Sequence, residues 1–195
     1  SKGDRLHEKP TVSFDYKSFG QAADHDDRVQ SLIVRDNLTK TTFAHPCNVK
    51  GPGDKWIVQR VLLDLDELGH DDVLLKGDGE PALIKLLKEV KQRRVENTVV
   101  EHPAAYDPQS NGAAEKAVQE IMEQIRALKL ALEKRIGEVV ESESLILEWA
   151  LEHAGLLISR YKLGKYGKTA FRRLCGKDCR QVIVEFGEQV YAKPK

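Results

Sequence analysis

The order of the expected secondary-structure elements predicts an α/β protein with a mixed five-stranded sheet flanked by helices. Three short strands come first, at residues 11–16, 31–35 and 41–44, and their short connections favour an antiparallel meander. A β-α-β-α-β succession follows, which adds parallel neighbours through crossover helices. Two long helices complete the pattern, so we expect helices on both faces of the sheet.

The first three strands are indicated by β-branched and aromatic residues that lie between breakers. Residues 11–16 read Thr-Val-Ser-Phe-Asp-Tyr after Pro10, a composition typical of strands. Residues 18–28 are polar and contain a glycine, as expected of a turn-like connection. Asp36 and Asn37 lie near the turn between the second and third strands.

The crossover units carry clear start and stop signals. Asp54 is well placed as the N-cap of a helix that ends at Gly69. A short apolar strand at residues 72–76 follows, and Pro81 opens the second helix. Residues 98–101 form the fifth expected strand.

Two long helices are expected in the last part of the chain, each with an apolar face toward the sheet. Apolar residues recur every three or four positions from Ala114 to Leu132, and Gly137 ends that helix. The final long helix is expected over residues 145–161. Its predicted inner side consists of Leu145, Ile146, Trp149, His153, Leu156 and Leu157. On this apolar face we expect His153 to be a core histidine with its hydrogen bonds satisfied.

The domain organisation predicted is one domain with short appendages. Residues 1–9 read as a linker, 10–164 as the core, and 165–195 as a basic extension with a strand pair near 181–186 and 189–192. The chain starts without Met, which suggests a fragment of a longer polypeptide. Composition, with 41% hydrophobic and 32% charged residues, is that of a soluble globular protein, and no apolar stretch is long enough to span a bilayer.

Charge gives a divided signal about partners. The formal net charge of zero is weak evidence against nucleic-acid binding, because such proteins usually carry a basic excess. The charge is uneven, however, since ten Lys and Arg but only three Asp and Glu follow Gly155. This segment is either a solvated basic tail or a surface that contacts phosphates.

Three cysteines give no sign of a disulfide framework. Cys47, Cys175 and Cys179 form an odd and sparse set. Cys175 and Cys179 lack a second Cys or His pair at zinc-finger spacing, so we expect reduced thiols.

Three carboxylates stand out by their positions. Asp15 lies inside the first strand, Asp78 follows the fourth, and Glu115 lies in the first turn of a long helix. A charge in a buried strand is costly unless it is paired or bound to metal. If the first and fourth strands are neighbours, the helix could bring Glu115 over both aspartates. Such a cluster suits Mg²⁺ or Mn²⁺, but spacing alone cannot exclude ordinary surface carboxylates among 31 acidic residues.

Local motifs around these carboxylates resemble those of retroelement integrases. Residues 102–116, His-Pro-Ala-Ala-Tyr-Asp-Pro-Gln-Ser-Asn-Gly-Ala-Ala-Glu-Lys, resemble the loop and helix that carry the family's last catalytic acid. Residues 76–80, Lys-Gly-Asp-Gly-Glu, and 12–15, Val-Ser-Phe-Asp, resemble the other two acidic motifs. Residues 167–176 and 184–190 resemble the segment after the core in long-terminal-repeat retrotransposon polyproteins.

The resemblance implies an RNase H-like integrase catalytic core, a metal-dependent polynucleotidyl transferase that processes 3′ ends of element DNA and joins them to target DNA. It implies Asp15, Asp78 and Glu115 as catalytic and metal-binding residues, holding Mg²⁺ or Mn²⁺ as two ions. It also implies DNA as partner, a homodimer or higher oligomer, and action in the nucleus after assembly in cytoplasmic particles. The DNA contacts it suggests are Lys76, Gln109, Asn111 and Lys116.

Other readings remain open at the level of sequence. The same fold serves cut-and-paste transposases and ribonucleases H, and a decayed or domesticated copy could be a binding module without activity. The chain also departs from the family pattern at Gly79, where Asn is common, and at Gln119, where some members carry a DNA-contacting Lys. The cluster at residues 24–27, Asp-His-Asp-Asp, is interpreted as a charged loop rather than a cation site.

Overall fold

The computed structural model describes residues 9–19, 29–101, 112–141 and 144–189. The strands are β1 (Thr11–Phe19), β2 (Val29–Asp36), β3 (Thr42–Cys47), β4 (Asp72–Lys76) and β5 (Asn97–Val100). The helices are α1 (Lys55–Leu68), α2 (Pro81–Arg93), α3 (Gly112–Ile136), α4 (Ile146–Tyr161) and α5 (Ala170–Cys175), with a 3-10 turn η3 (Lys165–Gly167) between the last two.

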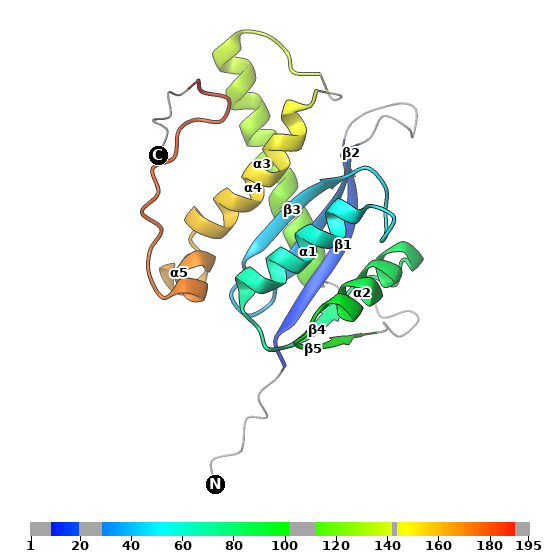
Figure 1. The fold of residues 1–195 in the computed structure, drawn as a ribbon. Helices are drawn as coiled ribbons and strands as arrows, with labels where there is room; N and C mark the ends of the chain where they lie inside the picture. The colour runs from blue at the N-terminus through cyan, green and yellow to red at the C-terminus, as the bar shows by residue number, and fades with distance from the viewer. Residues whose placement is uncertain (1–8, 20–28, 102–111, 142–143, 190–195) are drawn as a thin grey trace, which may run out of the picture.

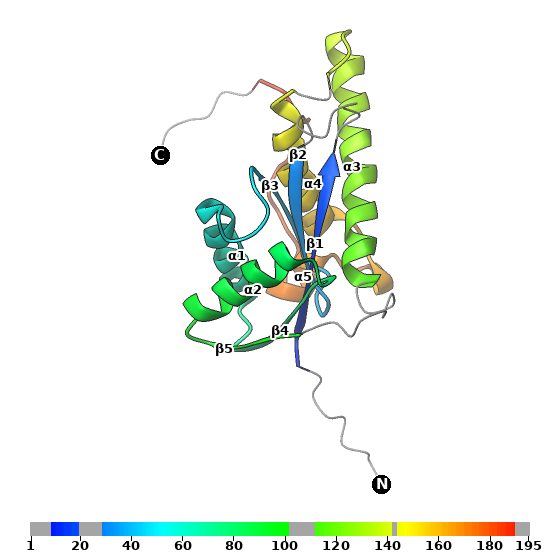
Figure 2. The same cartoon turned by 90° about the vertical axis from the view of Figure 1, so that its right-hand side faces the viewer.

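The five strands form one mixed sheet in the order β3-β2-β1-β4-β5. β1 pairs antiparallel with β2 and β2 with β3, whereas β1 pairs parallel with β4 and β4 with β5. Helices α1 and α2 cover one face, and α3 and α4 cover the other (Figures 1 and 2). The mixed five-stranded sheet with helices on both faces, predicted from the sequence, is therefore confirmed.

Two hydrophobic clusters fill the layers on either side of the sheet. The first joins Val12 and Phe14 of β1 to buried residues of α1 and α2. The second joins Ile33 of β2 to buried residues of α3 and α4. Because side chains alternate along a strand, Ser13 and Asp15 of β1 point to the opposite face from Val12 and Phe14.

Capping residues fix the crossover helices where the sequence predicts them. Asp54 accepts hydrogen bonds from the backbone nitrogens of Trp56 and Ile57, at 3.0 and 3.3 Å, and so caps α1. Gly69 ends α1 in the left-handed conformation, with φ of 68°. Pro81 stands at the first position of α2.

Strand lengths differ modestly from the prediction. β1 continues to Phe19, into the stretch expected to be a turn, because its last residues still pair with β2 as far as Val29. β3 extends to Cys47 and contains Pro46. β3 is an edge strand, so Pro46 removes no hydrogen bond from the interior of the sheet.

The predicted inner face of α4 is correct at Leu157, which packs against the second cluster, but wrong at its two most exposed members. Leu145 and Trp149 are 73% and 74% exposed. The buried residues of the helix are Ala150, Leu151, Ala154, Gly155, Ile158 and Ser159. Small side chains let the helix backbone approach β3 closely, which turns the bulkier residues outward. His153 is half-buried rather than in the core, and its ring lies 5.4 Å from that of Phe186.

The strand predicted at residues 181–186 does not form. Side chains, rather than a neighbouring strand, bind the carbonyl groups at the two ends of this segment: Tyr161 Oη donates to Gln181 O at 2.8 Å, and Arg135 Nη2 donates to Phe186 O at 2.7 Å. The segment runs past α5 toward α3 (Figure 1). Its expected partner at 189–192 lies outside the described residues beyond Gln189.

The structure also bears on the predictions about the cysteines, the acidic loop and membrane-spanning segments. The three cysteines are free thiols. Residues 24–27 lie outside the described part of the chain. No helix in the described ranges combines the length and apolarity needed to cross a bilayer.

Candidate active site

Asp15 and Asp78 lie along two parallel neighbouring strands. The last register pair of β1 and β4 joins Ser13 to Lys76. Asp15 follows Ser13 by two residues on β1, and Asp78 follows Lys76 by two residues just beyond the end of β4. The two aspartates therefore occupy equivalent places along adjacent strands, at the point where β4 ends and the sheet opens.

Glu115 comes to the same side of the sheet through α3. Ala114 and Ala117 are fully buried on either side of it, and these small residues bring the first turns of α3 onto the sheet. Glu115 itself is exposed. Because Asp15 points to the face that α3 covers, the helix presents Glu115 on the side where Asp15 lies.

The charge of Asp15 is destabilised by its surroundings. Burial raises its pKa to about 6, and the carboxylates of Asp78 and Glu115 add to the rise, whereas Lys17 opposes it. The influence of Asp78 and Glu115 on Asp15 is consistent with three carboxylates in one electrostatic neighbourhood. A group perturbed by burial together with like charges is typical of functional sites.

The loop after β4 holds Asp78 by local contacts. Asp78 Oδ1 accepts a hydrogen bond from the backbone nitrogen of Glu80 at 2.9 Å. Gly79 has φ of 88°, a conformation that favours glycine. Gly77 is required by packing, because a Cβ there would meet Leu83 Cδ2 at 2.6 Å. Gly77 thus allows close contact with α2, a reason that the sequence did not reveal.

The three carboxylates share a neighbourhood but do not converge on one point. Among the described residues, no three His, Cys, Asp or Glu side chains lie close enough to hold one metal ion between them. Asp78 and Glu115 are exposed, while Asp15 is half-buried.

The four residues predicted to contact DNA differ in exposure, and two of them lie outside the described residues. Lys76 Nζ pairs with Glu101 Oε1 at 3.3 Å and is largely buried, so the sequence missed that it has a partner. Lys116 is exposed beside Glu115. Gln109 and Asn111 lie outside the described residues.

Lys17 was missed by the sequence reasoning. It lowers the pKa of Asp15, so its charge acts on the carboxylate cluster. The signal was available in the sequence, because residues two apart on a strand share one face.

Comparison with known proteins gives matches in structure only. No family model matches the sequence, and no curated protein matches it. Among solved structures, the simian T-cell lymphotropic virus intasome in complex with PP2A regulatory subunit B56 gamma matches with a TM-score of 0.63 at 14% identity. That match covers 94% of this chain and 60% of the other, so this chain spans less than two thirds of it.

Two integrase catalytic core domains match over nearly their whole lengths. The HTLV-2 domain in complex with magnesium, in its trimeric form, gives a TM-score of 0.61 at 12% identity, covering 84% of this chain and 95% of that one. The BIV domain gives 0.53 at 14% identity, covering 85% and 93%. Identity at this level establishes a shared fold. The chain therefore has the RNase H-like fold of retroviral integrase catalytic cores.

Proposed function

We propose that this chain is an integrase catalytic core that performs metal-dependent 3′-end processing of retroelement DNA and its strand transfer into target DNA. The observation that carries the proposal is the placement of three carboxylates, with Asp15 within β1, Asp78 just past the end of the neighbouring strand β4, and Glu115 in the first turn of α3. The raised pKa of Asp15, caused by burial and by the charges of Asp78 and Glu115, agrees with this placement. The three carboxylates lie on the strand, strand end and helix named by the sequence motifs. The integrase-core fold supplies the second support.

Asp15, Asp78 and Glu115 are the residues that would hold the metal. Their donors are all carboxylate oxygens, which suits hard cations such as Mg²⁺ or Mn²⁺. The mutual repulsion of the three groups also favours a cation, since a positive charge between them relieves it. One of the matching structures is an integrase core in complex with magnesium. Two ions held there would supply activation of an attacking hydroxyl and stabilisation of the leaving oxygen of a phosphodiester.

Each residue has a distinct part in this arrangement. Asp15 is the fixed member, because the central strand β1 holds its backbone between β2 and β4. Asp78 and Glu115 are exposed and complete the site by turning toward Asp15. Lys17 and Lys116 lie beside the cluster in sequence and would attract the phosphates of a DNA strand.

The proposal includes partners and a place of action. DNA is the substrate, as element ends and as target. A homodimer or higher oligomer is proposed because the matching HTLV-2 core has dimeric and trimeric forms. Nuclear action after assembly in cytoplasmic particles completes the proposal, on the resemblance of the motifs alone.

The decisive experiment is strand joining on a branched DNA that mimics an integration product, with Mn²⁺ present. We expect activity in the wild-type chain, none without divalent metal, and none in Glu115→Gln. Glu123→Gln is the matched control, because Glu123 is an exposed glutamate further along the same helix. Equal activity in Glu115→Gln and the control would remove Glu115 from the chemistry.

A second substrate and a binding measurement separate the remaining readings. Cleavage of an RNA–DNA hybrid, with the branched DNA left intact, would identify a ribonuclease H instead. Thermal unfolding with added Mn²⁺ tests metal binding without activity: the midpoint should rise for the wild type and stay constant for Asp15→Asn. A folded chain with neither activity nor a metal-dependent midpoint would indicate a binding module.

A further inference from the structure

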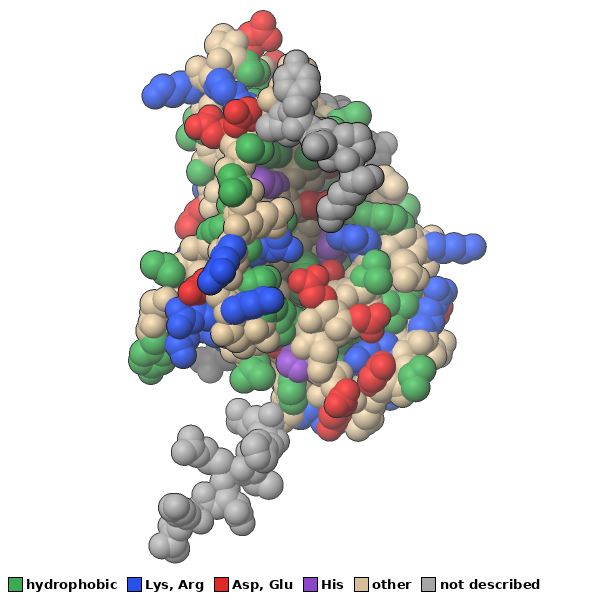
Figure 3. Space-filling view, turned by 60° about the vertical axis from the view of Figure 1, so that its left-hand side comes forward, with side chains coloured by type: hydrophobic (Ala, Val, Ile, Leu, Met, Phe, Trp, Pro, Cys, Tyr) green, Lys and Arg blue, Asp and Glu red, His purple; other side chains and the backbone are tan. Residues whose placement is uncertain are grey.

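A second site of concentrated charge lies between the core and the C-terminal segment. A cavity of about 250 Å³ opens where the β2–β3 turn, the start of α3, the end of α4 and the segment through α5 meet. The core contributes three basic side chains to its lining, Arg35, Lys40 and Lys116. The segment from the end of α4 into α5 contributes four more, Lys162, Lys165, Lys168 and Arg173. Figure 3 shows Lys and Arg side chains gathered on the side of the molecule where α5 lies.

Among the described residues one carboxylate, that of Glu120, lines this cavity, and two of the cations already pair with it. Glu120 lines the same cavity with 12% of its side chain exposed. Arg35 Nη1 pairs with its Oε2 at 3.0 Å, and Lys162 Nζ pairs with its Oε1 at 3.3 Å. No carboxylate in the described part of the chain forms an ion pair with the other five cations. The cavity therefore keeps a large uncompensated positive charge.

The cations approach closely enough to disturb one another. Burial lowers the pKa of Lys40, the positive charges of Arg35, Arg173 and Lys116 lower it further, and the carboxylate of Asp36 opposes them. These residues come from β2, α5 and α3, so the repulsion spans three elements. Bringing like charges together does not stabilise the folded state. An anion bound in the cavity would be attracted by all of these cations and would offset their mutual repulsion.

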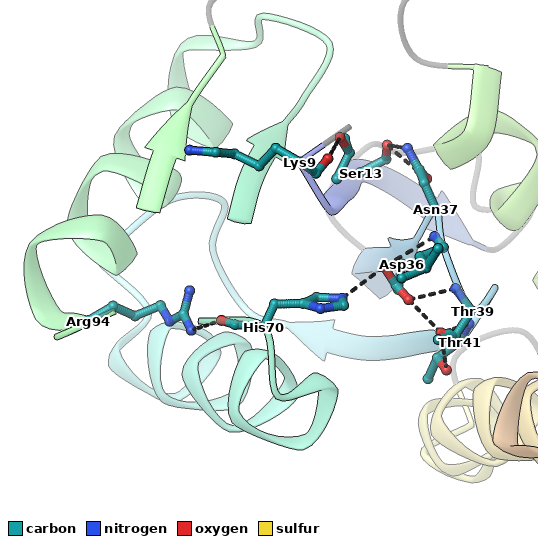
Figure 4. A network of polar contacts seen from close by, with 10 residues as sticks. Lys9, Ser13, Asp36, Asn37, Thr39, Thr41, His70 and Arg94 are labelled. Atoms are coloured by element: carbon teal, nitrogen blue, oxygen red, sulfur yellow. Dashed lines mark hydrogen bonds and ion pairs between the residues drawn. The ribbon is translucent and has the colours of Figure 1, made fainter. Parts of the chain in front are cut away.

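Lys40 is held in place by a network beneath the turn. Asp36 Oδ2 accepts hydrogen bonds from Thr39 N at 2.8 Å and Thr39 Oγ1 at 2.5 Å, and Asp36 Oδ1 lies 3.2 Å from His70 Nε2 (Figure 4). Lys40 has φ of 71°, unusual for a residue other than glycine. A turn fixed in this way sets the backbone position from which the Lys40 side chain reaches the cavity.

We propose that this cavity is a binding site for an anion that carries two or more closely spaced phosphate groups. Lys and Arg are the side chains that bind phosphate, Arg through its planar fork and Lys as a point charge. Ala113 brings the N-terminal end of α3 to the cavity, which adds the positive end of the helix dipole. The volume is below that of most drug-sized ligand pockets, so it suits a compact polyphosphate or a few linked phosphates of a nucleic-acid strand.

The position of the cations gives the site a structural consequence. The ligand would bridge Lys40 of the core to Lys168 and Arg173 of the C-terminal segment. Binding would hold that segment against the core. The site shares Lys116 with the proposed DNA contacts but uses none of the three carboxylates, so this inference goes beyond the proposed transferase chemistry and its test does not require that chemistry.

The test is calorimetric titration of the whole chain with inorganic tripolyphosphate in EDTA, so that no metal at the carboxylates contributes. We expect 1:1 binding and a rise in the thermal unfolding midpoint. The variant Lys40→Gln with Lys168→Gln should bind at least tenfold more weakly. Lys85→Gln with Lys88→Gln is the matched control, because it removes the same charge from the exposed face of α2 and should bind as the wild type does.

A charge-conserving variant separates a loss of phosphate binding from a loss of folding. Lys168→Arg keeps the charge and should retain wild-type affinity, whereas Lys168→Gln alone should lose part of it. No binding by the wild type, or equal weakening in the cavity and α2 variants, would overturn the proposal.

A parallel titration with a short single-stranded DNA distinguishes the two sources of phosphate. A loss of DNA affinity in the cavity variant alone, with displacement of tripolyphosphate by DNA, identifies a nucleic-acid backbone. Unchanged DNA affinity with lost tripolyphosphate binding identifies a free polyphosphate. Both outcomes support the phosphate site, and neither depends on turnover.

Discussion

Ser159 on α4 binds both backbone groups of Thr42 on the edge strand β3. Its hydroxyl accepts a hydrogen bond from Thr42 N and donates one to Thr42 O, each at 2.8 Å. An exposed edge strand offers unpaired backbone groups to other chains. At this position the helix side chain takes the place of a neighbouring strand and closes the edge.

Loss of this contact should destabilise the fold. Ser159→Ala leaves the buried backbone groups of Thr42 without their partner, which costs about 1–3 kcal/mol. Urea unfolding followed by circular dichroism gives the free energy of unfolding. A value equal to that of the wild type would mean that water replaces the hydroxyl without loss.

Gly155 should be intolerant of a side chain for a related reason. A Cβ there would meet Ala44 N at 3.2 Å and Thr42 O at 3.3 Å, both backbone atoms of β3. Ser159 holds that strand in place, so the strand cannot retreat freely. We expect Gly155→Ala to lose about 1 kcal/mol net, because overpacking outweighs the gain in helix propensity.

Gly53→Ala is the matched control for that substitution, since a Cβ at Gly53 meets nothing within 4 Å. The thermal unfolding midpoints of the two variants and the wild type should be compared under one condition. A more stable Gly155→Ala chain would show that β3 yields to the added methyl group.

Neutralising Asp15 should stabilise the protein at neutral pH. The pKa of Asp15 is raised from 3.8 to about 6 in the folded protein. The free energy of unfolding therefore falls as the pH rises from 3.8 to about 6, and the full cost of the buried charge is present above that range. Asp15→Asn should therefore gain on the order of 1 kcal/mol near pH 7.5, after allowance for solvent screening, and nothing near pH 3.5. Asp66→Asn, an exposed position on α1, serves as control.

The buried pair of His45 and Asp64 should also make the protein less stable as the pH rises, but at higher pH values than Asp15 does. Burial alone lowers the pKa of His45, but the hydrogen bond to Asp64 and the carboxylate of Glu152, whose Oε1 lies 3.8 Å from His45 Nδ1, outweigh it and raise the pKa above 6.5. His45 Nε2 lies 2.7 Å from Asp64 Oδ2, and the positive charge of Arg60 also faces the pair.

A raised histidine pKa contributes stability that is complete below pH 6.5 and is lost as pH rises through the folded value. The free energy of unfolding should therefore fall between neutral and mildly alkaline pH. His45→Gln should abolish this slope while lowering stability at pH 6. A slope that persists in His45→Gln would assign it to another group.

The sequence predicted the sheet and its crossovers because the signals there are local. Asp54 and Gly69 mark the ends of α1, and Pro81 marks the start of α2. The face of α4 could not be predicted, since Trp149 and Gly155 exchange their expected places only when β3 is present to pack against. The same limit applies to residues 181–186, whose partners are side chains of distant helices.

The candidate site shows the same division. Motifs placed Asp15, Asp78 and Glu115 on the correct elements, but only the structure shows that their charges interact. The basic cavity could not be found from sequence, because Lys40 and Lys168 belong to segments far apart in the chain. The excess of Lys and Arg after Gly155 indicated part of it, but not the contribution of Arg35, Lys40 and Lys116 from the core.

The parallel pairing of β1 with β4 also determines when the acidic site can exist during folding. Val12 pairs with Leu75, so the chain must close a loop that contains two further strands and α1 before Asp15 and Asp78 can meet. Closing such a loop costs chain entropy, and local contacts do not offset that cost. We therefore expect β1 and β4 to pair late in folding. A chain still emerging during synthesis would therefore have strands and helices but no assembled carboxylate cluster.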